Sequence, residues 1–167
     1  MKPHSLLYVI SSFFFLPACG QQSLEEKLES IYRHTVPLVQ PEQLENWQVS
    51  GKELILLDIR SPKEYQVSHL KGAELIDYES FDPGIIAHIS KTSTVVVYCS
   101  VGYRSERVGE KLKELGFQEV YNLYGGIFQW KNQGNPIVNS NNQTTDSVHV
   151  YNKKWGQWLK QGIKVYD

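Results

Sequence analysis

The sequence predicts an α/β fold in which a parallel sheet of four to five strands has helices on both faces. Strand-like and helix-like segments alternate four or five times along the chain, which is the pattern of a parallel sheet. Two strand-like segments, residues 53–58 and 94–98, are apolar almost throughout, as expected of strands that helices cover on both sides. Ligands of such sheets bind beyond the carboxyl ends of the strands, so a functional site is expected there.

The first predicted element is a helix that begins at Ser23. Leu24, Leu28 and Ile31 share one face of this helix, and Glu26 completes a capping box with Ser23. We expect the helix to pack on the domain, the alternative being a solvated spacer. The later elements are expected in this order: an extended segment at 36–39, a helix from 41 through 47, a strand at 53–58, a helix opened by 61–64, a strand at 73–76, a helix at 83–89, a strand at 94–98, a helix at 105–115, a strand at 119–123 and a helix at 125–133.

The N-terminus resembles the signal peptide of a bacterial lipoprotein. The apolar run at residues 6–16 is shorter than the about 20 residues that cross a bilayer, but it suits a secretory signal. The sequence ending in Ala18-Cys19 resembles a lipobox, so we assign residues 1–18 to the signal peptide and expect a lipid on Cys19. An ordinary cleaved signal and a retained anchor are the alternatives. We expect an exported protein of the cell envelope, and Gly20 favours lipid anchoring to the outer membrane on the periplasmic side.

Composition excludes several classes of function. The formal net charge is −1 and the sequence has no basic run, so no nucleic-acid partner is expected and the membrane is contacted only through the lipid. Once Cys19 is lipidated, Cys99 is the one remaining thiol and a structural disulfide is impossible. No histidines and cysteines stand at zinc-ligand spacing, so we expect neither a metal site nor a cofactor.

A cysteine loop follows the strand at 94–98 and leads into a helix. The loop consists of Cys99, Ser100, Val101, Gly102, Tyr103, Arg104 and Ser105. The helix N-terminus, the backbone curl that Gly102 permits and the charge of Arg104 all favour an anion in the loop. We therefore expect Cys99 to be partly thiolate near neutral pH and to act as a nucleophile. The alternative, that Cys99 is an ordinary buried apolar residue, leaves the glycine and arginine without a purpose.

Three segments in order resemble a rhodanese domain, the fold of sulfurtransferases. They are residues 57–73, in which Ser68 replaces a commoner glycine, the cysteine loop, and residues 122–136. The resemblance implies that Cys99 takes a sulfur atom from a small donor such as thiosulfate, carries it as a persulfide, and passes it to a thiol or cyanide-like acceptor. It also implies that loop residues 100–105 bind the substrate, with Arg104 on the oxyanion end of the donor. The alternative for Arg104 is a salt bridge that closes the loop.

The supporting residues and partners follow from the same resemblance. Asp58 and Arg60 are expected to brace the loop or each other, and His69 is expected to pack rather than act as a base. We expect a monomer whose acceptor is a small thiol or a protein of the envelope.

Three rival functions remain. Cysteine-dependent phosphatases place one residue more between cysteine and arginine than separates Cys99 from Arg104, and they tend to have histidine where Tyr98 stands. A non-catalytic docking module of the same fold has often lost the cysteine, which is present here. The third rival is a redox function, in which Cys99 could only form mixed disulfides with other molecules.

We divide the chain into the signal peptide 1–18, an N-terminal helix or spacer 19–35, the rhodanese domain 36–138, a polar linker 139–146 and a C-terminal helical extension 147–167. In the extension, Asn152 is expected to cap a helix in which Trp155, Trp158 and Leu159 share one face. We expect this face to pack on the domain. The alternative is that it borders the cysteine loop and shapes acceptor access.

Overall fold

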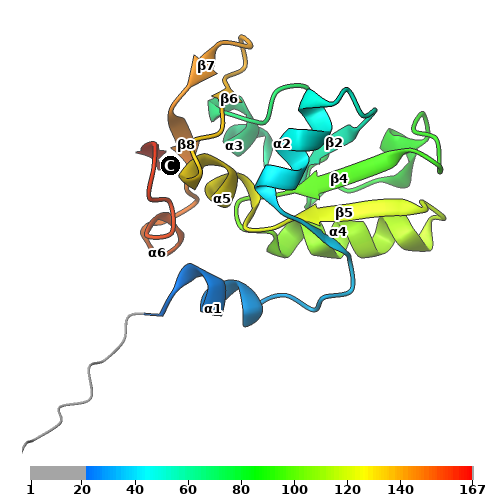
Figure 1. The fold of residues 1–167 in the computed structure, drawn as a ribbon, viewed down its shortest axis with the longest axis horizontal. Coiled ribbons are helices and arrows are strands. Elements are labelled where there is room, and N and C mark those ends of the chain that lie inside the picture. The colour runs from blue at the N-terminus through cyan, green and yellow to red at the C-terminus, as the bar shows by residue number, and fades with distance from the viewer. Residues whose placement is uncertain (1–21, 167) are drawn as a thin grey trace, which may run out of the picture.

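The computed structural model describes residues 22–166, so the predicted signal peptide and Cys19 lie outside the described residues. Its centre is a sheet of five parallel strands in the order β1-β5-β4-β2-β3, which confirms the predicted fold class (Figure 1). The strands are β1 (Leu38–Val39), β2 (Ile55–Asp58), β3 (Glu74–Leu75), β4 (Thr94–Tyr98) and β5 (Glu119–Leu123).

Helices cover both faces of the sheet. They are α1 (Leu24–Glu29), α2 (Pro41–Val49), α3 (Pro62–Val67), α4 (Tyr103–Glu114) and α5 (Gly126–Asn132), with a 3₁₀ turn η1 (Pro83–Ile86) in place of the longer helix expected at 83–89. The helix after the cysteine loop begins at Tyr103, two residues earlier than predicted, because Gly102 adopts the left-handed conformation that caps it. The α4 N-terminus therefore lies closer to Cys99 than the sequence pattern indicates.

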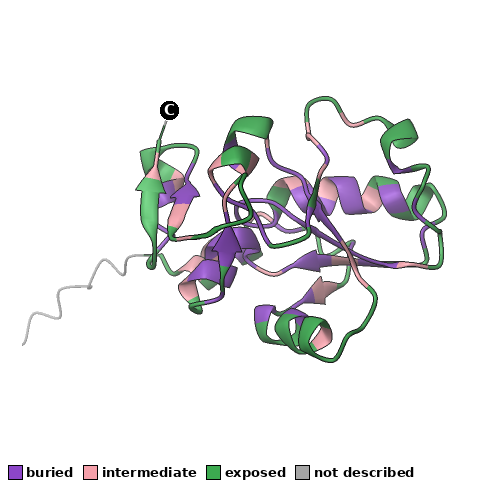
Figure 2. Ribbon diagram, turned by 90° about the horizontal axis from the view of Figure 1, so that it is seen from above, coloured by how far each residue is buried: buried purple, intermediate pink, exposed green. Residues whose placement is uncertain are grey.

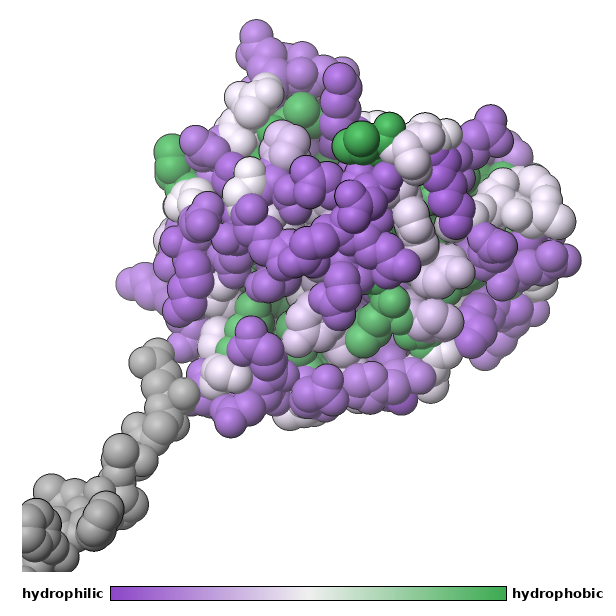
Figure 3. Space-filling model, viewed as in Figure 1, coloured by the Kyte–Doolittle hydropathy of each residue, from purple (hydrophilic) through white to green (hydrophobic). Residues whose placement is uncertain are grey.

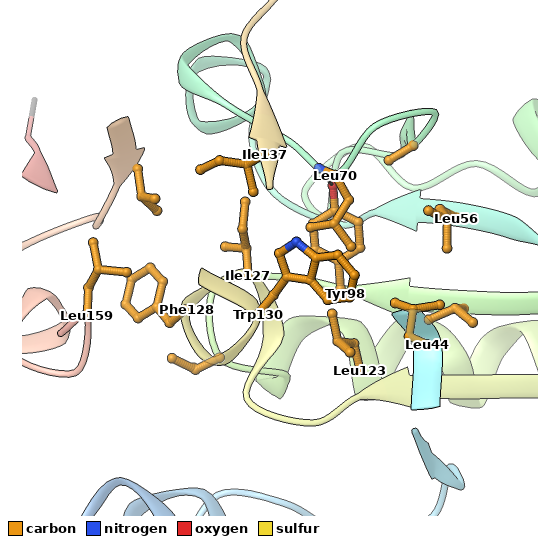
Figure 4. Packing of buried hydrophobic residues seen from close by; sticks show 14 of the residues in the cluster. Leu44, Leu56, Leu70, Tyr98, Leu123, Ile127, Phe128, Trp130, Ile137 and Leu159 are labelled. Carbon is orange, nitrogen blue, oxygen red and sulfur yellow. Dashed lines mark hydrogen bonds between the residues drawn. The ribbon is translucent and has the colours of Figure 1, made fainter. Parts of the chain in front are cut away.

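Successive residues of β4 divide between two hydrophobic clusters. Val96 and Tyr98 belong to a cluster with α1, α2 and α5, whereas Val95 and Val97 belong to a cluster with α4 and η1. Figure 4 shows Tyr98 and Trp130 among the side chains of the first cluster. Burying both faces explains why the β4 sequence is apolar almost throughout rather than alternating (Figure 2).

The N-terminal helix α1 packs on the domain and is no solvated spacer. Its Leu28 is fully buried in the first cluster, and the Ser23–Glu26 capping box forms as predicted. Beyond α1, Glu106 of α4 accepts hydrogen bonds from the backbone N–H groups of Arg33 and Thr35. These contacts fix the segment after α1 against α4.

The segment predicted as a polar linker, 139–146, contains the turn and the second strand of a short hairpin. Its β7 (Thr144–Thr145) pairs antiparallel with β6 (Ile137–Val138). The Asn139 side-chain oxygen accepts hydrogen bonds from the N–H groups of Asn141 and Gln143, and Asn142 adopts a positive φ of 57°. The asparagines are thus turn residues, because their side chains satisfy the backbone of a tight turn.

The C-terminal extension is only partly helical, which corrects the prediction for 147–167. Strand β8 (Ser147–His149) pairs in parallel with β9 (Ile163–Val165), and between them α6 (Lys153–Gly156) is a single turn capped by Asn152 as expected. Trp158 and Leu159 are buried in the first cluster, so the extension packs on the domain. It lies at the end of the sheet toward which β4 and β5 run (Figure 1). The molecular face in Figure 3 is mostly hydrophilic with scattered apolar patches.

Candidate active site

Cys99 follows β4 directly and lies in the wall of a cavity at the carboxyl end of the sheet. The cavity has a volume of about 300 Å³ and is lined by Glu79, Cys99, Ser100, Val101, Tyr103, Arg104, Tyr151 and Trp155. The Gly102 N–H points at the Cys99 sulfur, with an N to Sγ distance of 3.2 Å. Although only 1% of the residue surface is exposed, the cysteine borders a space that can hold a substrate.

The predicted loop residues divide into those that face the cavity and those that support it. Five of the seven line the cavity, and Gly102 contributes its backbone N–H to the sulfur. The side chain of Ser105 is fully buried and donates a hydrogen bond to Asn122 Oδ1 at 2.7 Å. The Ser105 side chain thus connects α4 to β5 and does not line the cavity.

A buried glutamate holds Arg104, a partner that the sequence did not reveal. Arg104 donates from Nη1 and Nη2 to the two carboxylate oxygens of Glu64 at 2.8 and 2.7 Å, and Ser100 Oγ donates to the same carboxylate at 3.0 Å. The salt bridge that was the alternative for Arg104 is thus present. Because it fixes the guanidinium at the cavity wall, Arg104 is both a loop support and a lining residue.

The charges of this pair stabilise each other. Burial raises the pKa of Glu64. The hydrogen bonds and charge of Arg104, with the Ser61 N–H and the charge of Arg60, outweigh this effect and lower the pKa to about 2. Burial lowers the pKa of Arg104, while Glu64 and the neighbouring Cys99 raise it above its ordinary value. Arg104 therefore presents a permanent positive charge close to the sulfur.

Tyr32, from the segment after α1, supports the cysteine loop through two hydrogen bonds. Its hydroxyl donates to the Val101 carbonyl at 2.7 Å and accepts from the Gly125 N–H at 3.0 Å. Asn122 Nδ2 donates to the Gly102 carbonyl at 3.0 Å. The cysteine loop is therefore tied to segments before and after it in the chain, and sequence reasoning missed Tyr32.

Asp58 and Arg60 brace each other rather than the cysteine loop. Both are fully buried, and their side chains approach to 2.6 Å in a bidentate ion pair. Arg60 also donates to the Ser68 carbonyl. Ser68 has an extended backbone with φ of −170°, which any residue adopts, so serine is tolerated in place of glycine. The pair stabilises the turn after α3.

His69 has the packing role that was expected. Its ring stacks on Tyr65 with a centroid distance of 3.8 Å, and its Nδ1 lies 3.1 Å from the Tyr65 carbonyl oxygen. It does not line the cavity.

Three other kinds of site are relevant to the described residues: a second hollow, a metal site and a membrane-spanning helix. A larger hollow of about 740 Å³ lies at the opposite end of the sheet, lined by residues 52–55 and 92–94, and contains no cysteine or histidine. Within residues 22–166 no cluster of acidic, cysteine and histidine side chains could hold a metal ion. No helix in the same range combines the length and apolarity needed to span a membrane.

The family model of the rhodanese-like domain matches residues 40–133, more than half of the chain. The chain belongs to the rhodanese-like family. This range contains Cys99, Arg104 and Glu64 and ends just after α5, so the C-terminal extension lies outside the match.

Several curated relatives of this rhodanese-like chain are named as sulfurtransferases. The probable adenylyltransferase/sulfurtransferase MoeZ of Mycobacterium tuberculosis is 35% identical over 99 residues, which cover 59% of this chain and 25% of the relative. The thiosulfate sulfurtransferase GlpE of Coxiella burnetii is 33% identical over 89 residues, covering 53% of this chain and 82% of GlpE. The chain thus spans a quarter of MoeZ and most of GlpE.

Solved structures show the same fold. The rhodanese-like domain of an Anabaena protein matches with a TM-score of 0.57 and 24% identity, over 62% of this chain and 79% of that one. A thiosulfate sulfurtransferase from Pseudomonas aeruginosa matches with a TM-score of 0.58 and 19% identity, over 74% of this chain and 23% of that one.

Proposed function

We propose that this protein is a sulfurtransferase that carries a sulfur atom on Cys99, taking it from a donor such as thiosulfate. The observation that carries the proposal is the Gly102 N–H aimed at the Cys99 sulfur in the wall of a cavity that Arg104 also lines. A backbone donor and a fixed guanidinium favour negative charge on sulfur, which both the thiolate and the persulfide require.

Transfer proceeds in two displacements. The Cys99 thiolate attacks the outer sulfur of thiosulfate, an S–S bond forms to Cys99, and the bond to the sulfonate sulfur breaks with its electron pair leaving on sulfite. Arg104 faces the oxyanion end of the donor, while its bond to Glu64 keeps the guanidinium in place. An acceptor thiolate then attacks the outer sulfur of the persulfide, and Cys99 leaves as thiolate. No net oxidation or reduction is needed.

We also propose that the lipid predicted on Cys19 holds this reaction at the envelope membrane. The support is the apolar run at residues 6–16 followed by Ala18-Cys19. Acceptors would then be thiols or proteins of the same compartment.

The test uses the full-length chain with Cys19→Ser, so that Cys99 is the sole cysteine. Thiocyanate formation from thiosulfate and cyanide is compared with a variant that also carries Cys99→Ser. We expect formation of thiocyanate by the parent and none above background by the variant. Phosphate ester hydrolysis without thiocyanate would favour a phosphatase, and the absence of both activities would favour a docking module.

A further inference from the structure

We propose that the C-terminal extension makes the cavity over Cys99 selective for acceptor thiols that carry an apolar, ring-sized substituent. The proposal rests on the sulfur transfer proposed above and names the acceptor class. Tyr151 and Trp155 belong to the extension, yet they line the same cavity as Cys99, Tyr103 and Arg104. The extension therefore builds part of the site, although it lies outside the family match.

The extension is held in place firmly enough to form a wall. Val148, Val150, Trp158 and Leu159 are buried in the first hydrophobic cluster. Asn132 of α5 donates from Nδ2 to the Trp158 carbonyl at 2.9 Å. The Asn132 oxygen accepts from the N–H of Lys160 at 2.6 Å. These contacts fix the segment that carries α6 against the domain.

Three aromatic side chains, each partly exposed, contribute to the cavity lining. Tyr103 is 43% exposed and Tyr151 is 57% exposed, while Trp155 is half-buried with the Lys27 ammonium 5.6 Å from its ring centroid. Tyr151 adopts a positive φ of 62°, a conformation that is costly for tyrosine, and its backbone N–H donates to His149 Nδ1 at 3.2 Å. Exposed rings beside a reactive group suit an apolar ligand, because covering them removes apolar surface from water.

The volume and lining of the cavity limit which acceptor substituents fit it. At about 300 Å³ the cavity is at the lower end of the range for organic small-molecule sites. Cyanide would leave the aromatic wall uncovered, whereas one aromatic or branched aliphatic group would contact it. The charge of Arg104 is balanced by Glu64, and Glu79 adds a carboxylate to the lining. Because Arg104 also faces the anionic donor in the first step, the lining sets the size and apolarity of the acceptor substituent but not its charge.

The chemistry of the step is balanced without a further reagent. The acceptor thiolate R–S⁻ attacks the outer sulfur of the Cys99 persulfide, a new S–S bond forms, and the bond to the Cys99 sulfur breaks. The product is the persulfide of R, and the Cys99 thiolate is restored. The group R is then the part of the acceptor that lies between Tyr103, Tyr151 and Trp155.

The test compares a benzyl compound with a small one on the full-length chain with Cys19→Ser. The rates at which benzyl and methyl methanethiosulfonate modify Cys99 are measured, and their ratio is divided by the ratio for glutathione, which corrects for the intrinsic reactivity of the two reagents. Sulfur transfer to benzyl mercaptan and to 2-mercaptoethanol is measured in parallel. We expect the protein to favour the benzyl compounds by about tenfold, the size of a good apolar contact.

The variants are Tyr151→Gly, which removes the ring and accepts the positive φ, and Trp155→Ala. The matched control is Tyr166→Ala, because Tyr166 is an exposed aromatic of the same extension that does not line the cavity. We expect both cavity variants to lose the benzyl preference and the control to keep it, with melting temperatures confirming that each variant folds.

Two outcomes separate this inference from the proposed function. If the parent shows no benzyl preference in modification, or if the cavity variants retain it, the acceptor selectivity is wrong. If the modification preference behaves as expected but no sulfur reaches either thiol or cyanide, the selectivity of the cavity holds and the sulfur transfer is wrong.

Discussion

The cysteine loop depends on glycine at position 102, and Gly102→Ala tests this dependence. Gly102 has φ of +93°, which is strained for a residue with a Cβ atom. A Cβ atom there would lie 2.1 Å from the Tyr32 hydroxyl and 2.8 Å from the ring carbon that carries it. Tyr32 would have to move, and its hydrogen bonds to Val101 and Gly125 would lengthen or break.

The expected cost has two parts. The left-handed conformation costs about 1–2 kcal/mol for alanine. Each buried hydrogen bond lost by Tyr32 adds about 0.5–1.5 kcal/mol. We expect Gly102→Ala to lower the free energy of unfolding by about 2–5 kcal/mol. Gly116→Ala is a matched control, because Gly116 has φ of +89° but no atom within 4 Å of the place that its methyl group would occupy, so only the conformational part applies.

The assay is urea unfolding followed by circular dichroism for both glycine variants, for Tyr32→Phe, and for the double variant Gly102→Ala with Tyr32→Phe. Since Tyr32→Phe already removes the hydroxyl that the methyl group meets, the two changes should cost less together than the sum of their separate costs. Equal losses for Gly102→Ala and Gly116→Ala, with additive effects in the double variant, would refute the reasoning.

Two further predictions concern buried ion pairs. Because the pKa of Glu64 is lowered to about 2, its stabilising charge is fully present above about pH 4.5 and is lost as the pH falls toward 2. Glu64→Gln should therefore lower the free energy of unfolding by about 3 kcal/mol at pH 7. The difference in unfolding free energy between variant and parent should disappear as the pH is lowered to near 2, and a difference that does not change with pH would contradict the prediction. Asp58→Asn leaves the fully buried Arg60 charge without its partner and should cost about 3–5 kcal/mol in urea unfolding, whereas a loss under about 1 kcal/mol would show that the pair is dispensable.

The sequence predicts the parallel sheet because its strands and helices are signalled locally. The capping box at Ser61 and Glu64, the apolar strand β4 and the glycine in the cysteine loop are all patterns of a few residues. For the same reason the position of Cys99 at a strand end is predicted correctly. Local patterns carry these features because each depends only on near neighbours in the chain.

The supports of the site could not be predicted, because they join residues far apart. Glu64 and Arg104 are 40 positions apart, and Tyr32 is 69 positions from Val101. Neither pairing leaves a signal in one sequence, and Glu64 already has a sufficient local explanation as a capping residue.

The prediction of a helical C-terminal extension differs from the structure for another reason. Strands β8 and β9 have three residues each, too few for a periodic pattern to distinguish them from a helix. The spacing of Trp155, Trp158 and Leu159 fits a helix, yet α6 ends at Gly156. Burial of Trp158 and Leu159, rather than helical periodicity, accounts for that spacing.

The central claim is that Cys99 holds the transferred sulfur, and intact-protein mass measurement tests it most directly. The full-length chain with Cys19→Ser is treated with thiosulfate, freed of excess reagent and measured before and after addition of cyanide. The account predicts a mass gain of one sulfur atom on Cys99 that cyanide removes as thiocyanate, and no gain when Cys99 is also replaced by serine. A protein that gains no sulfur, or that gains it equally without Cys99, would contradict the account.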